Sequence, residues 1–192
     1  MRVLVACEYS GIVREAFRKR GHDAWSCDLL PTDIPGQHIQ GDVLAELDKG
    51  WNLMIAHPPC TYLSNAGARF LYPHGALNND RLNLAIQARE FFMGLYNASI
   101  EKICIENPIP TRICGLPKYD QIIQPYYFGD MAQKKTCLWL KNLPKLTYKE
   151  PKEKPQSTKI AGNWFNKGGK DRQKNRAKTF QGIADAMATQ WS

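Results

Sequence analysis

The sequence of 192 residues lacks two features that would place the chain in a membrane or outside the cell. No apolar run approaches the roughly 20 residues of a membrane-spanning helix, and the first residues show no signal-peptide pattern. The six cysteines also lack the close-paired spacing that is typical of metal sites. We therefore expect a cytoplasmic protein with reduced thiols, no membrane partner and no bound metal.

Glycine is scarce in the one turn where a nucleotide-binding loop would need it. Residues 2–7 (RVLVAC) predict a first strand, and the turn that follows, residues 8–11, contains only Gly11. A dinucleotide-binding fingerprint has three glycines at this place. The turn therefore does not predict a dinucleotide or phosphate site, although Ser10 can cap a helix that runs from about Gly11 to Arg20.

Acidic residues are scarce in the later part of the chain. The net charge is +8, but residues 133–178 hold 14 Lys and Arg residues against three acidic ones, whereas the remainder holds 12 against 15. This split favours a surface that faces a polyanion, and nucleic acid is the first candidate. Residues 144–178 are rich in Pro, Lys and Gly and predict a long, irregular basic loop, with a solvated tail as the alternative.

Short apolar runs alternate with helical patterns over the rest of the sequence. A strand at 24–28 ends in Asp28, and a short strand at 38–40 is followed by Asp42. This order is typical of a Rossmann-type sheet that binds the adenosine end of a cofactor, because the acid can take the ribose hydroxyls. Further strands are predicted at 53–56, 102–105, 122–128 and 136–140, and helices at 78–98 and 179–191. The pattern predicts one α/β domain over residues 1–192.

The helix at 78–98 is the most strongly patterned helix in the sequence. Asn78 or Asn79 can cap its first turn. Its apolar positions recur at helical spacing, so one face should turn toward the core, formed by Leu84, Ala88, Phe91 and Leu95.

Two reactive side chains follow neighbouring strands of the predicted sheet. Two prolines break off the strand at 53–56, so Cys60 is predicted on a stiff loop at the carboxyl edge, where open α/β folds bind ligands. Glu106 follows the strand at 102–105, and a carboxylate raises the pKa of a nearby thiol. The pair suits a heteroaromatic ring, because the thiol can add to a ring carbon while the acid engages a ring nitrogen. For His57, a structural and a functional role both stay open.

The Cys60 loop resembles the nucleophile loop of DNA cytosine-5 methyltransferases, of the compact type carried by phages and prophages. The family loop reads Pro-Cys-Gln-x-Phe-Ser-x-Ala-Gly, and residues 59–67 read PCTYLSNAG, with Thr in place of Gln. Residues 106–108 (ENP) are similar to the family motif Glu-Asn-Val. Residues 133–137 (QKKTC) are similar to its Gln-x-Arg-x-Arg motif with both arginines lost, and residues 181–184 resemble its closing helix.

The resemblance implies a Rossmann-like methyltransferase sheet that is mostly parallel, has one antiparallel strand and carries helices on both faces. It implies that Cys60 attacks carbon 6 of cytosine, that Glu106 engages ring nitrogen 3, and that carbon 5 accepts a methyl group from S-adenosylmethionine. A lysine, Lys135, then takes a catalytic place that belongs to a family arginine. The implied cofactor contacts are Cys7, Glu8, Ser10, Gly11, Asp28, Asp42 and Pro58. The implied substrate contacts are Pro59, Ser64, Asn107, Pro108, Gln133 and Lys134.

The resemblance covers residues 1–143 and about 172–191, and the family's target-recognition domain is missing between them. The basic residues 133–178 take its place, so DNA is the expected partner, in a bacterial or phage-infected cell. Duplex DNA, single-stranded DNA, RNA and a free nucleotide all stay open as substrates, and so does the oligomeric state. Two other functions stay open as well. One is an amino-methyltransferase, because residues 57–60 (HPPC) also resemble the Asp/Asn/Ser-Pro-Pro-aromatic motif, and the other is a degenerate nucleic-acid-binding module.

Overall fold

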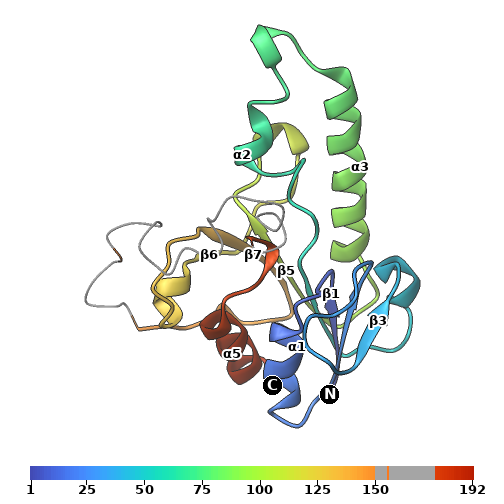
Figure 1. Ribbon diagram of the computed structural model, residues 1–192, viewed down its shortest axis with the longest axis vertical. Coiled ribbons are helices and arrows are strands. Elements are labelled where there is room, and N and C mark those ends of the chain that lie inside the picture. Colours follow the sequence, from blue (N-terminus) through green and yellow to red (C-terminus); the bar gives the residue numbers. More distant parts are fainter. Residues whose placement is uncertain (150–154, 156–175) are drawn as a thin grey trace.

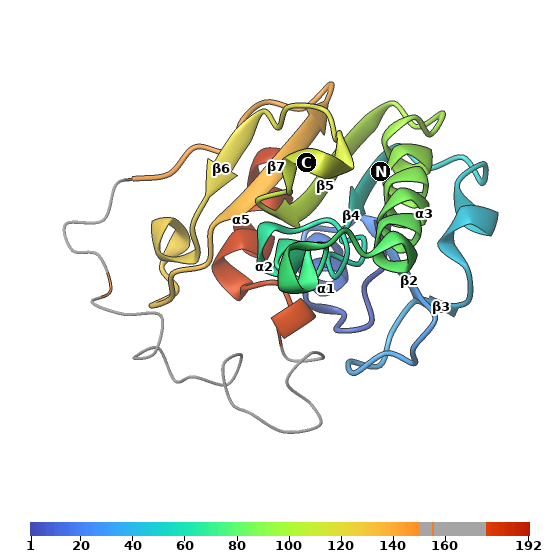
Figure 2. The ribbon, with the colours of Figure 1, turned by 90° about the horizontal axis from the view of Figure 1, so that it is seen from above.

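The computed structural model describes residues 1–149, 155 and 176–192. Seven strands in this part of the chain form one sheet in the order β3-β2-β1-β4-β5-β7-β6, which can be followed across Figure 2. Their bounds are β1 Arg2–Ala6, β2 Asp23–Asp28, β3 His38–Gln40, β4 Leu53–Ala56, β5 Lys102–Pro108, β6 Gln121–Ile123 and β7 Thr136–Lys141. Every pair from β3 to β5 is parallel, and β7 runs antiparallel to both of its neighbours. The predicted Rossmann-like sheet with one antiparallel strand is confirmed.

Helices cover both faces of this sheet. The helices of the described chain are α1 (Ile12–Arg18), α2 (Asn65–Ala68), α3 (Asn79–Tyr96) and α5 (Gln181–Gln190), with short 3-10 helices η1 (Val43–Glu46), η2 (Pro73–Gly75), η3 (Arg112–Cys114) and η4 (Pro125–Phe128). Figure 1 shows α1 and α5 side by side, away from α3. None of the helices described is long and apolar enough to cross a membrane.

The alternation of side chains along each strand divides the core into two layers. On β1, Val3 and Val5 pack toward α1 and α5, whereas Leu4 and Ala6 pack toward α3. The central strands β1 and β4 are apolar on both faces because each face is covered by helices, as buried parallel strands require. The last helix contributes Ile183, Met187 and Trp191 to the first layer, as its periodicity predicted.

The predicted core face of α3 is confirmed at Leu95 and wrong at Leu84, while Ala88 and Phe91 are only partly buried against the core. Leu84 is 39% exposed, whereas Ala85, Phe92 and Leu95 are the buried residues of the helix. Phe92 packs edge-on against Trp139 of β7, with ring centroids 5.0 Å apart. Since each residue turns a helix by about 100°, a stripe displaced by one residue lies on a visibly different face. The predicted cap is confirmed, because the Asn78 side chain accepts a hydrogen bond from the Arg81 N–H at 3.0 Å.

The predicted strand at 122–128 is also too long. Strand β6 ends at Ile123, and residues 125–128 form η4 instead. Pro125 has no N–H to offer a neighbouring strand, and its restricted φ suits the first turn of a helix. The predicted basic loop at 144–178 lies mostly outside the described residues.

The buried and exposed faces of α3 predict different losses of stability for the same substitution at two positions. Leu95→Ala should lower the free energy of unfolding by about 2–5 kcal/mol, because it opens a cavity in a fully buried site. Leu84→Ala removes the same atoms from a partly exposed site and should cost less than about 1 kcal/mol. Urea unfolding of both variants measures the difference, and equal losses would contradict the observed face.

Candidate active site

The register of three parallel strands brings together residues that are far apart in the sequence. Ala6 at the end of β1 pairs with Ala56 of β4, and Ala56 pairs with Ile105 of β5. The residues that follow these three, among them His57 and Glu106, therefore meet at the carboxyl edge of the sheet. The strand order reverses between β1 and β4, so this edge is the topological switch point where open α/β sheets bind ligands.

His57 and Glu106 form a direct hydrogen bond across this edge. The Nδ1 atom of His57 lies 2.9 Å from Oε2 of Glu106, and the two side chains are only 7% and 12% exposed. Burial by itself raises the pKa of Glu106, but the hydrogen bond from His57 and the positive charge of Lys134 outweigh it and hold this pKa below its usual value. The carboxyl group at this edge is therefore a buried carboxylate with a histidine partner.

The Cys60 loop is held against the end of β5. The Asn107 side chain donates to the Pro58 carbonyl at 2.7 Å, which pins the two-proline segment. The Thr111 N–H donates to the Leu63 carbonyl at 2.8 Å, so the chain after β5 runs alongside the loop. These bonds give Asn107 a structural part in placing Cys60, which is partly exposed.

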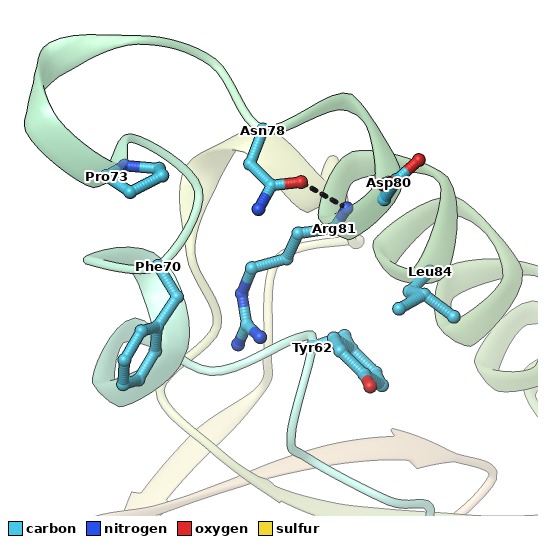
Figure 3. Close-up of a pocket in the computed structure, with 7 residues that line it drawn as sticks. All are labelled: Tyr62, Phe70, Pro73, Asn78, Asp80, Arg81 and Leu84. Atoms are coloured by element: carbon cyan, nitrogen blue, oxygen red, sulfur yellow. Dashed lines mark hydrogen bonds between the residues drawn. The ribbon is translucent and has the colours of Figure 1, made fainter.

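A second set of contacts supports the loop from the α3 side. Arg81 of α3 donates to the Thr61 carbonyl at 3.1 Å, and its guanidinium lies 5.0 Å from the ring centroids of both Tyr62 and Phe70. These three side chains line a pocket of about 370 Å³. Figure 3 shows the pocket at the base of residues 69–78, which connect α2 to α3. A Cβ at Gly67 would come within 2.6 Å of the Thr61 carbonyl oxygen, so the loop closes only with glycine there.

The thiol of Cys60 is not activated by its surroundings. Burial first, and then the charge of Glu106, raise the pKa of the Cys60 thiol, while Lys134, a backbone hydrogen bond and Arg176 act in the opposite direction. The expectation that the acid opposes thiolate formation is therefore confirmed. A reaction at Cys60 needs a base or a proton acceptor to take the thiol proton.

The two lysines before β7 have different surroundings. The Lys134 ammonium donates to the Arg176 carbonyl at 3.1 Å and lies 5.9 Å from the Phe180 ring, and its charge acts on both Cys60 and Glu106. Lys135 is exposed, and its charge is not among those that shift either group. In the structure, the charge of Lys134, rather than that of the expected catalytic Lys135, acts on the pKa values of Cys60 and Glu106. Gln133 donates to the Pro155 carbonyl, on the side of the basic segment.

The remaining expected substrate contacts lie along the loop and the strand beside it. Pro59 is exposed and immediately precedes Cys60, whereas Ser64 is buried at the start of α2 and pairs with Pro110 in an isolated bridge. Pro108 ends β5, opposite Thr136 of β7. Ser64 is therefore placed to hold the loop.

The expected cofactor residues gather at the ends of β1, β2 and β3. Burial first, and then Asp28, Cys27 and Asp42, raise the pKa of the Cys7 thiol, so these side chains share one small region. Asp28 accepts from the Leu30 N–H at 2.9 Å, and Asp42 accepts from the Leu44 N–H at 3.0 Å. Each carboxylate keeps further lone pairs at an exposed edge, as acceptors for the hydroxyl groups of a ribose need.

The first turn of α1 is capped mainly by Glu8, and the predicted cap at Ser10 adds one longer hydrogen bond. The Glu8 carboxylate accepts from the Val13 N–H at 2.7 Å and from the Arg14 N–H at 3.2 Å, and the Ser10 hydroxyl donates to it at 3.1 Å. The longer side chain of Glu8, two residues earlier, reaches these N–H groups. The Ser10 hydroxyl accepts a hydrogen bond from the Ile12 N–H at 3.4 Å. Gly11 has a φ of 75°, which favours glycine.

The Glu8 cap decides which cofactors suit this edge. A helix N-terminus is the place where dinucleotide cofactors bind their phosphates, but here a buried carboxylate already occupies it. A second negative charge at this point would be repelled. S-adenosylmethionine carries no phosphate, so the site residues fit it. No group of three or more metal-ligating side chains occurs in the part of the chain that the structure describes.

One residue that matters to the site, Arg81, was not singled out from the sequence, and the role of another, His57, stayed open. Arg81 reads as an ordinary surface residue of an amphipathic helix, and only the fold brings it to Thr61. His57 had a detectable signal, because it is the first residue after a buried strand and precedes two prolines. Its partner, however, lies 49 positions away.

Comparisons with known proteins find similar chains among solved structures only. No family model matches the chain, and neither does any curated protein. Among solved structures, the chain is similar to a prophage-encoded E. coli protein to which a DNA modification methyltransferase function has been attributed. The two share 15% identity with a TM-score of 0.46, over 73% of this chain and 46% of the other. This chain thus matches less than half of that protein's length. The function of this chain therefore has to be inferred from its own site residues.

Alkylation of Cys60 tests the electrostatics of the site without any substrate. Glu106→Gln removes a negative charge that raises the pKa of the Cys60 thiol, so iodoacetamide should label Cys60 several-fold faster at about pH 8. Mass spectrometry of the Cys60 peptide separates this signal from the other cysteines. Glu101→Gln, an exposed acid just before β5, is the matched control and should leave the rate unchanged. Equal rates in both variants would contradict the coupling.

Proposed function

We propose that this protein transfers a methyl group from S-adenosylmethionine to carbon 5 of cytosine in nucleic acid, with Cys60 as the nucleophile. The observation that carries the proposal is the pairing of Cys60 with Glu106 at the switch point of the sheet, within reach of each other's charge. A thiol can add to carbon 6 of a pyrimidine, and a carboxyl group can exchange a proton with the adjacent ring nitrogen.

The division of the sheet edge supports this assignment of roles. The half formed by β1, β2 and β3 offers Asp28 and Asp42 to a nucleoside, while the half formed by β4 and β5 offers Cys60 and Glu106 to a base. When bound, S-adenosylmethionine supplies the methyl group to the carbon next to the one that Cys60 attacks. Glu106 then holds the ring edge while its charge is balanced by Lys134.

Nucleic acid is the proposed partner because positive charge borders the site. Lys134 and Arg176 both act on the Cys60 thiol, and they belong to the stretch 133–178 that holds 14 Lys and Arg residues. Such residues bind phosphates without reading sequence. In a duplex the cytosine would have to leave the base stack to reach Cys60, whereas a single strand avoids most of that cost.

Binding of the cofactor can be tested apart from the reaction. Asp28→Ala should weaken the affinity for S-adenosylmethionine by about 10- to 100-fold, because a charged acceptor of hydrogen bonds is lost. Isothermal titration calorimetry measures this, with Asp48→Ala, an exposed acid away from the strand ends, as the control. A wild-type protein that binds neither the cofactor nor its demethylated product would refute the cofactor assignment.

Covalent trapping tests the nucleophile. An oligonucleotide that carries 5-fluorocytosine should form a stable adduct with the protein when S-adenosylmethionine is present, because the fluorine cannot leave carbon 5 as a cation. Cys60→Ser should abolish the adduct, since a hydroxyl group has almost no anionic form at neutral pH. Glu106→Gln should slow trapping by at least about tenfold, with Glu101→Gln as control. Denaturing gel electrophoresis and mass spectrometry detect the adduct.

Duplex DNA, single-stranded DNA, RNA and the free nucleotide are tested in parallel in this experiment. Methyl transfer that persists in Cys60→Ala would exclude the cytosine-5 reaction, and methylation of an exocyclic nitrogen without an adduct would identify an amino-methyltransferase. Tight binding of nucleic acid with neither adduct nor methylation would identify a binding module.

A further inference from the structure

The hydrogen bond between His57 and Glu106 satisfies a buried carboxylate, but it leaves the second nitrogen of the His57 ring unpaired within the described part of the chain. The His57 ring is nearly buried, and its Nε2 atom has no hydrogen-bond partner among the described residues. Leaving a buried polar atom unpaired costs stability, and such groups call for a functional reason. The ring's one hydrogen bond to a described side chain is the bond to Glu106, so that bond is what the ring provides.

The backbone holds this ring in a single place. The His57 N–H donates to the Ala6 carbonyl at 2.9 Å, which continues the β1–β4 ladder by one residue. Two prolines follow, and the carbonyl of the first, Pro58, accepts a hydrogen bond from the Asn107 side chain. His57 can therefore act on Glu106 with little loss of entropy when a substrate binds.

From these contacts we infer that His57 is a positioning residue that keeps Glu106 in its carboxylate form, so that Glu106 first accepts the Cys60 thiol proton and then delivers it to ring nitrogen 3. This inference rests on the proposed function. It explains how a thiol with a raised pKa can still attack, because a proton acceptor follows the neighbouring strand, close enough for its charge to act on the thiol.

The proposed step balances without any other reactant. The S–H bond of Cys60 breaks, its proton passes to the Glu106 carboxylate, and the sulfur forms a bond to carbon 6 of cytosine. The electrons of the C5–C6 double bond shift to C4–C5, and those of the C4–N3 double bond move to nitrogen 3. Nitrogen 3 then takes the proton from Glu106, which returns to its carboxylate form. The ring is left with a nucleophilic carbon 5.

Few other groups near Glu106 can titrate near neutral pH. The groups whose charge or hydrogen bonds are coupled to Glu106 are His57 after β4, Cys60 in the loop, Cys104 on β5, Lys134 before β7, and Thr136 and Cys137 on β7. Burial raises the pKa of Cys104 well above its usual value and that of Cys137 to about 11, so both thiols stay neutral. Burial raises the pKa of Glu106 and the hydrogen bond from His57 lowers it, so removing His57 should raise this pKa.

The test compares His57→Leu with His57→Asn, whose amide can still donate near the position of Nδ1. Trapping of 5-fluorocytosine oligonucleotide is measured in a single turnover from about pH 5 to pH 8, with S-adenosylmethionine at saturation. In His57→Leu, the raised pKa of Glu106 leaves more of this group protonated at the low end, and the protonated form cannot take the thiol proton. Trapping should therefore fall at least about tenfold below wild type there and recover as the pH rises. His57→Asn should restore the wild-type profile.

Two results would overturn the inference. A loss in His57→Leu that is equal at every pH would mean that His57 only supports the fold, and circular dichroism and cofactor affinity check the fold directly. Trapping that is faster than wild type at low pH would mean that Glu106 begins the reaction as an acid.

Failure of the proposed function would be recognised separately, because wild type would then trap none of the substrates. The state of Glu106 can still be read in that case by isotope-edited infrared spectroscopy, with Glu106→Gln identifying its band. A carboxylate band in wild type that converts to the protonated form at low pH only in His57→Leu supports the role of His57. A protonated Glu106 in wild type at neutral pH refutes it.

Discussion

The parallel register of β1, β4 and β5 is the constraint on which the rest of the site depends. Pairing of Ala6 with Ala56, and of Ala56 with Ile105, brings the three strands to an end at the same level. His57 and Glu106 follow directly, so their side chains meet without any loop having to carry them together. A slip of one residue in either pair would turn one of these side chains to the opposite face of the sheet. The two buried layers prevent such a slip, since it would disrupt the packing of side chains on both faces.

Charge balance at this edge follows from burial. A carboxylate that is 12% exposed needs compensation, and it receives a hydrogen bond from His57 and the field of Lys134. The same carboxylate opposes ionisation of the neighbouring thiol, so Cys60 and Glu106 cannot both hold a negative charge cheaply. The proton transfer that we propose between them would resolve this conflict, because one of the two groups would be neutral at each moment. Lys134 suits such a site as a point charge that needs no planar partner.

The edge of the sheet is divided between two chemical environments. Around β1 to β3, Asp28 and Asp42 end their strands with free acceptor oxygens, and Glu8 already occupies the N-terminus of α1, which suits a nucleoside without phosphates. Around β4 and β5, a partly buried thiol and a buried carboxylate lie beside positive charge. Helix α3 supports the second half, since Arg81 donates a hydrogen bond to the carbonyl of Thr61, the residue after Cys60.

Local pattern in the sequence determined the elements of this fold and the two reactive positions. Strands β1, β3 and β4, the cap at Asn78 and the last helix were predicted from apolar runs and capping residues, because these signals act over a few neighbouring residues. The errors arose at two positions. At Leu84, a shift of one residue along α3 turns the side chain away from the core, and at Pro125 a proline ends the strand. Tertiary structure alone decided that His57 meets Glu106 and that Glu8 is the main cap of α1. It also decided that the charge of Lys134, rather than that of Lys135, acts on Cys60 and Glu106. These contacts depend on side-chain length, on register and on positions up to 49 residues apart, and no local pattern encodes such distances.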